Sequence, residues 1–282
     1  MAEKDITEKI LMDYNDIFSD IINVLLFKGK RRVEPDSLEA VALPSQYKAE
    51  DGKIHEQERD VTKYWKGNGI RIALFGLENQ TESEKDMVFR AIGYDGANYR
   101  SQLFSDSTER VPVITLVLFF GSGHWTAPKR LKELISIPEG LDEYISDYKI
   151  NVFEISWLTD EQVAMFQSDF GVVADFFVNK RKNPQYEPSD TRTIKHVDEV
   201  LKLLSVMTGD NRYENILKDT GKEEIHTMCD VAERLEKKGY DSGLKDGAEK
   251  ERESIYQELV KDGVLTAEEA AKRSGIPPEK LL

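Results

Sequence analysis

The residues whose types and spacing best suit chemistry stand at the end of an apolar segment, IRIALFGLENQ, residues 70–80. Alternate side chains of a strand share one face, so Glu78 and Gln80 would lie together. Asp60 lies in the preceding segment, ERDVTKYW. Two carboxylates that converge at the end of a sheet would bind a hard divalent cation such as Mg²⁺. The cation would polarise a phosphodiester and activate a water molecule, which Gln80 could orient.

The two segments are predicted to form a β-hairpin, because the glycine-containing turn KGNG separates them. We expect a register that pairs Trp65 with Ile70 and Asp60 with Phe75. Bulges and strand twist would then have to bring Asp60 close to Glu78. The alternative interpretation is that the strand simply ends in solvent, and spacing alone favours this alternative.

Composition limits the class of protein. The chain has 282 residues, of which 39% are hydrophobic and 33% charged, and these values are typical of a soluble folded protein. The longest apolar run, residues 111–120, is too short to cross a bilayer and predicts a central strand. The charged N-terminus lacks the apolar stretch of a signal peptide, so we expect a cytoplasmic protein that does not bind membranes.

The net charge and the spacing of metal-ligating residues limit the class of protein further. The net charge of −14 argues against loose affinity for nucleic acid, although an acidic nuclease site with a local basic groove is compatible with it. Cys229 is the single cysteine, which excludes an internal disulfide. The four histidines are scattered without zinc-ligand spacing.

The remaining pattern predicts a mixed α/β core. Thr81 and Glu84 are expected to form a capping box at the start of one helix, and Thr159 to cap another. A further strand is expected over residues 149–158. Helices are expected over residues 8–27, 81–104, 158–181, 194–209 and 211–219.

The last fifty or so residues differ from this core. Gly239, Gly243 and Gly247 recur in a polar setting, which predicts an exposed helix or a flexible linker. The end of the chain, residues 265–282, reads as two short helices broken at Gly275 and Pro277, similar to part of a helix-turn-helix. We therefore expect a domain over residues 1–230 and a helical tail over residues 231–282.

Several segments together resemble the Rpn family of recombination-promoting nucleases, also labelled transposases. They are ERDVTKYW, ALFGLENQTE, MVFRAIGYD, FEISWLTDEQVAMFQSDF and LKLLSVMTGDNRYE, and the similarity extends over about residues 10–230. This family belongs to the PD-(D/E)XK nuclease superfamily. The resemblance implies a restriction-endonuclease-like fold, in which helices flank a mixed sheet and the catalytic acids lie on a hairpin of central strands. It also implies Mg²⁺-dependent, or other divalent-cation-dependent, cleavage of DNA in recombination or mobile elements.

The resemblance assigns roles to five residues. Asp60 and Glu78 take the two acidic positions and would bind the metal, and Gln80 stands where lysine is usual. Because glutamine cannot supply positive charge, the site would depend more on its metal. Arg90 and Tyr94 lie four residues apart on one helical face, in a pattern similar to one in the family. They would contact a DNA phosphate or support Glu78; alternatively, Tyr94 packs in the interior and Arg90 forms a surface ion pair.

Two further residues have two interpretations each. Asp20 could be the acid that the superfamily often adds from a helix before the hairpin, but a solvated helix face is the simpler interpretation. Trp125 lies in a loop beside Lys129 and Arg130, where it could touch nucleic acid. The favoured interpretation is that Trp125 anchors this loop to the core.

Three classes of function follow. The leading hypothesis is a metal-dependent DNA endonuclease, and a Glu78→Ala variant would then lose cleavage. The second is a catalytically inactive nuclease fold that acts as a DNA-binding or protein-interaction module, which Gln80 and the net charge favour. The third is a passive scaffold core whose helical tail assembles homo-oligomers or recruits a partner.

Overall fold

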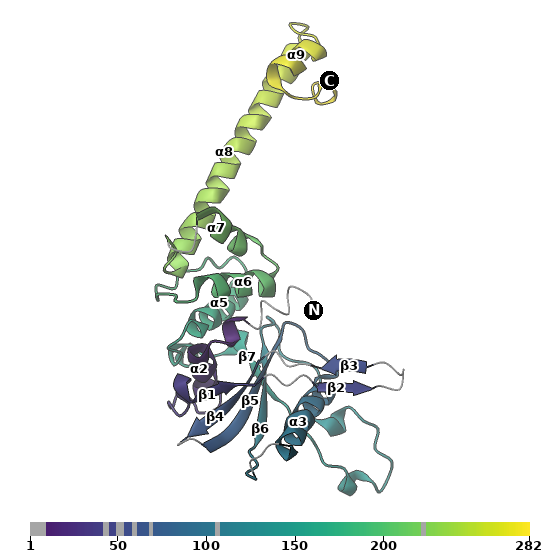
Figure 1. The fold of residues 1–282 in the computed structure, drawn as a ribbon. Coiled ribbons are helices and arrows are strands. Elements are labelled where there is room, and N and C mark those ends of the chain that lie inside the picture. Colours follow the sequence, from purple (N-terminus) through teal and green to yellow (C-terminus); the bar gives the residue numbers. More distant parts are fainter. Residues whose placement is uncertain are drawn as a thin grey trace. The chain divides into compact units, whose positions relative to one another are not determined.

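The computed structural model describes residues 10–41, 45–48, 54–57, 61–67, 70–104, 108–220 and 224–282 (Figure 1). The chain divides into two compact units, residues 1–229 and residues 230–282. Among the described residues, no helix is both long and apolar enough to span a membrane.

The first unit is built on a mixed sheet of five strands in the order β1-β4-β5-β6-β7. The strands β1, β4 and β5 are antiparallel, whereas β5, β6 and β7 are parallel. The arrangement is consistent with a restriction-endonuclease-like fold, and it confirms the predicted fold class. The strand bounds are Leu38–Ala40 for β1, Val61–Gly67 for β4, Ile70–Gln80 for β5, Val113–Phe119 for β6 and Asn151–Glu154 for β7. A separate two-stranded sheet pairs β2, Ser45–Lys48, with β3, Ile54–Gln57.

The hairpin of β4 and β5 forms, but its expected register is wrong. Trp65 pairs with Ala73, three positions further along β5 than Ile70. The strands remain paired up to Gly67 and Ile70, so the turn is two residues shorter than expected, and a bulge after Trp65 adds the third position.

Helices cover both faces of this sheet (Figure 1). On one face, Tyr94 of α3, Met87–Leu103, packs with Val117 and Phe119 of β6. On the other face, buried Lys63 of β4 reaches α2, Asn15–Leu25, where its Nζ donates a hydrogen bond of 2.6 Å to Asn15 Oδ1.

Two helix predictions near the site need correction. The helix expected from residue 81 begins at Met87, and the Glu84 carboxylate accepts a bond from the Asp86 N–H rather than forming a capping box with Thr81. The helix expected over residues 158–181 is two helices, α4, Asp160–Ala164, and α5, Phe170–Lys182. The predicted Thr159 capping box at the start of α4 is confirmed.

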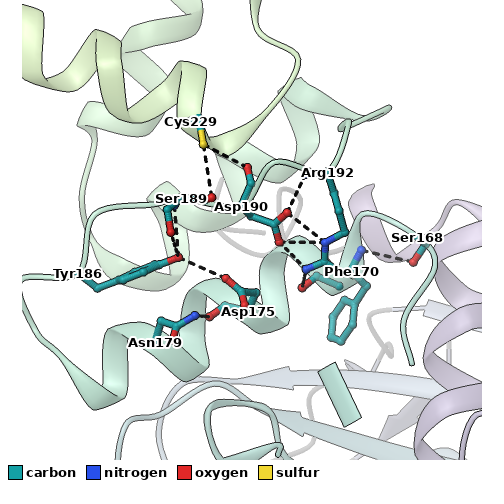
Figure 2. Close-up of polar contacts among 10 residues, drawn as sticks. Ser168, Phe170, Asp175, Asn179, Tyr186, Ser189, Asp190, Arg192 and Cys229 are labelled. Atoms are coloured by element: carbon teal, nitrogen blue, oxygen red, sulfur yellow. Dashed lines mark hydrogen bonds and ion pairs between the residues drawn. The ribbon is translucent and has the colours of Figure 1, made fainter. Parts of the chain in front are cut away.

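The segment that follows α5 folds back onto it through a polar network (Figure 2). The Tyr186 hydroxyl donates to Asp175 at 3.2 Å, and Arg192 donates to the Gly171 carbonyl at 2.9 Å. Arg192 also pairs with Asp190. Burial opposes a low pKa for Asp190, but the hydrogen bonds from Arg192 outweigh it, so the pKa of Asp190 is lowered. The two predicted helices that follow are α6, Val197–Thr208, and α7, Arg212–Thr220.

The second unit is helical. Helix α8, Met228–Lys261, runs without a break through the three spaced glycines, so this part of the chain is a helix and not a linker. A turn leads into α9, Ala267–Ser274, and then into a single 3₁₀ turn, Pro278–Lys280. Gln257 of α8 donates to the Lys280 carbonyl at 2.7 Å, and Leu281 is buried, so the end of the chain is folded against α8.

Candidate active site

The carboxyl-terminal end of β5 places Glu78 inside the protein. Glu78 pairs with Val117 and Gln80 with Phe119, and both pairs face α3. Glu78 is only 1% exposed. The interpretation that the strand ends in solvent is therefore wrong for Glu78, because its carboxylate is removed from water.

Arg90 of α3 reaches this buried carboxylate. Its Nη2 lies 3.3 Å from Glu78 Oε2, and the same nitrogen donates to the Tyr94 hydroxyl at 3.0 Å. Burial lowers the pKa of Arg90, but the Glu78 carboxylate and Tyr94 raise it by more, so the net shift is upward. The Arg90 side chain is 37% exposed, and it therefore connects solvent with the buried acid.

The structure brings together three of the five residues that the sequence singled out. Glu78, Arg90 and Tyr94 form one contact group, and Tyr94 is also part of the apolar core beneath α3. Gln80 shares the face of Glu78 one step further along β5. Asp60 lies outside the described residues. Its covalent neighbour Val61 pairs with Leu77, which is the covalent neighbour of Glu78.

Some of the side chains at the site could ligate a hard cation. The carboxylate of Glu78 and the amide oxygen of Gln80 are ligands that Mg²⁺ accepts. Among the described residues, no three histidine, cysteine, aspartate or glutamate side chains are grouped so that they could hold a metal. A magnesium site at Glu78 therefore depends on Asp60, and the metal roles of both acids remain predictions.

Asp20 does not lie on a solvated helix face, so that interpretation is wrong. It is 3% exposed, and its carboxylate accepts bonds from the main-chain N–H groups of Gln167 and Ser168, both at 2.8 Å. The Ser168 hydroxyl at 2.7 Å and Arg31 complete its described partners. These bonds hold the turn between α4 and α5, which assigns Asp20 a structural role.

Glu154 and His124 lie beside the site and were not singled out from the sequence. Glu154, at the end of β7, accepts the Trp125 N–H at 2.7 Å, and its other oxygen lies 2.9 Å from His124 Nδ1. Glu154 pairs with Phe119, as Gln80 does, so both residues lie on the face of Glu78. The sequence signal that could have identified Glu154 is its place as a polar residue at the end of an apolar strand. Trp125 is buried against Phe119, as the anchoring interpretation expects.

The mixed sheet and the buried acid at the end of a central strand are consistent with an α/β protein of the PD-(D/E)XK-like class. Residues 71–177 match the family described as "Putative transposase, YhgA-like". This family is the Rpn/YhgA group, so the match confirms, over this segment, the resemblance seen in the sequence. The match associates the chain with mobile elements. Neither a curated protein nor a solved structure is significantly similar to the chain.

Proposed function

We propose that the chain is a divalent-metal-dependent DNA endonuclease that hydrolyses phosphodiester bonds in recombination or mobile-element processes. The observation that supports this proposal best is the buried Glu78 carboxylate beside Arg90. Burying a carboxylate is costly even when it is paired, because the lost hydration must be replaced. Such groups gather at functional sites, where their charge is used.

Each residue of the site has a role in this proposal. Glu78 and Asp60 would hold Mg²⁺ or a similar cation, which, when bound, would polarise the phosphodiester and activate water. Gln80 would accept a hydrogen bond from the attacking water and so orient it. Arg90 fixes the Glu78 carboxylate, and its exposed part would contact the DNA backbone.

Cleavage of supercoiled plasmid by the full chain in Mg²⁺ tests the proposal. Glu78→Gln keeps the shape of the side chain and removes its charge, and it should slow cleavage by about a hundredfold or more. Glu82→Gln is the matched control, because Glu82 is exposed and only four residues further along. Equal cleavage by the wild type and Glu78→Gln would refute the proposed role of Glu78.

A DNA-binding or protein-interaction module without catalysis is the second candidate. The observation that favours it is Gln80, which lacks the positive charge that lysine supplies in the superfamily. A wild-type chain that binds duplex DNA in Mg²⁺ without cutting it would establish this second function instead.

We further propose that the helical tail mediates homo-oligomer formation. Helix α8 exposes Tyr240, Leu244 and Ile255 by about half or more of their surface. A long helix that exposes such residues and contains three glycines gains little stability from its own sequence. A second copy of the helix would bury these side chains.

A further inference from the structure

The loop after β6 presents an ordered stack of side chains next to the candidate active site. The His124 ring stacks on Trp157 with the ring centres 3.8 Å apart and the planes at 24°. On the indole, the Arg181 guanidinium lies 3.9 Å from the ring centre. Glu154 holds His124 Nδ1 at 2.9 Å. We name His124, Trp157, Arg181 and Glu154 the His124 platform.

The loop that carries His124 is fastened to its surroundings at several points. The Phe120 N–H donates to the Gln80 carbonyl at 2.8 Å, and the Thr126 N–H donates to Ser83 Oγ at 3.0 Å. The Trp157 indole N–H donates to the carbonyls of Ser122 and Gly123 at 3.2 and 3.1 Å. These bonds fix the loop against the end of β5, so His124 has a defined place beside the site.

The sheet register gives the separation of the platform from Glu78. Gln80, Phe119 and Glu154 form one row across β5, β6 and β7. Neighbouring strands are about 4.8 Å apart, so the row places Glu154 roughly 10 Å from Gln80. Glu154 holds His124 on this side of the row, so His124 is placed for a phosphate beside the bond that Glu78 would act on rather than for that bond itself.

The platform also has the chemistry for phosphate. With Nδ1 held by Glu154, His124 has Nε2 left for a ligand, and its side chain is 61% exposed. Arg181 Nε donates to the Ser156 carbonyl at 2.7 Å, and its two Nη groups can donate to an anion. Trp157 has His124 and Arg181 stacked on it, so it supports these two side chains rather than a stacked base.

We propose that His124 and Arg181 bind backbone phosphates of the DNA beside the bond presented to Glu78. This inference rests on the proposed nuclease function and adds a substrate-positioning subsite to it. In the proposed complex, His124 Nδ1 donates to Glu154 and Nε2 donates to a phosphate oxygen. Glu154 is a positioning residue, since it acts only through His124 and the loop.

The decisive variant is His124→Asn, because the asparagine amide can replace Nδ1 as the donor to Glu154 but has nothing in the place of Nε2. The probe is a short fluorescent DNA duplex, titrated with the full chain without divalent cation over a range of salt concentrations. His124→Asn should bind roughly tenfold more weakly. The slope of log affinity against log salt should fall by about one, which is the loss of one phosphate contact. Lys218→Gln, which removes an exposed cation from α7, is the control and should match the wild type.

Unchanged affinity and salt slope in His124→Asn, with normal DNA binding by the wild type, would overturn the inference and leave His124 as a loop anchor. In that case, loss of plasmid cleavage in Glu78→Gln would still support the nuclease. A wild-type chain that neither binds nor cuts DNA would overturn the nuclease and the subsite together. A melting temperature of His124→Asn equal to that of the wild type shows that the substitution leaves the fold intact.

Discussion

Replacement of Asp20 should destabilise the protein without acting through the metal. Its carboxylate accepts bonds from two main-chain N–H groups, the Ser168 hydroxyl and Arg31. A hydrogen bond to a charged group contributes about 1.5–3 kcal/mol, and these bonds share one acceptor, so their sum is not additive. We expect Asp20→Ala to lower the unfolding free energy by about 3–5 kcal/mol, because four part-buried donors lose the buried charged group that they share. Urea unfolding followed by circular dichroism measures this loss, and Asp20→Asn provides a milder variant if the alanine form does not fold.

Asp16 is the matched control for Asp20. It lies one turn earlier on α2 with its side chain 34% exposed, and its basic neighbours His196 and Lys195 are 3.5 and 3.8 Å away. Asp16→Ala should cost about 1 kcal/mol or less, as exposed pairs do. The structural assignment of Asp20 would be refuted if Asp20→Ala kept wild-type stability while Mg²⁺-dependent cleavage was lost, because a metal ligand behaves in that way.

Three further predictions concern the site, the α5 network and the tail. Arg90→Met should lower the unfolding free energy by about 1–3 kcal/mol in metal-free buffer, because Glu78 loses a charged donor. In urea titrations, Mg²⁺ should recover part of this loss. An equal loss with and without Mg²⁺ would contradict metal binding at Glu78. Burial raises the pKa of Asp190, but the hydrogen bonds from Arg192 lower it by more. The ionised Asp190 therefore stabilises the folded protein fully above the unfolded pKa of about 3.9, and this stabilisation disappears as the pH falls through the lower folded pKa. The difference in urea stability between the wild type and Asp190→Asn should therefore shrink below about pH 4, and a constant difference would contradict this origin. Deletion of residues 239–282 should reduce the mass measured by light scattering to that of a monomer and leave the melting of the first unit unchanged; an unchanged oligomeric state would contradict assembly through the tail.

Local sequence signals predicted the strands of the core well, but not how those strands pair. Alternating and continuous apolar runs identified β4, β5 and β6, since burial of apolar side chains dominates there. The register depended on the length of the turn and on a bulge after Trp65, and apolar periodicity encodes neither. Pairing that involves Val61 and Leu77 therefore emerged only from the structure.

Contacts between distant residues account for the other differences. The break between α4 and α5 is fixed by Asp20, which lies almost 150 residues earlier, so no pattern within residues 158–181 could reveal it. Glu154 and His124 meet because β7 lies beside β6, an adjacency that periodicity does not specify. By contrast, Arg90 and Tyr94 lie on one helical turn, and their shared face followed directly from the sequence.

The proposed phosphodiester hydrolysis depends on the binding of a divalent cation by Glu78. The most direct measurement is the uptake of Mn²⁺, as a spectroscopic substitute for Mg²⁺, by the full-length wild type and by Glu78→Gln, followed by electron paramagnetic resonance. We expect the wild type to bind an ion that Mg²⁺ displaces, whereas Glu78→Gln, folded to the same melting temperature, should not bind it. Equal uptake by the two proteins would contradict this proposal.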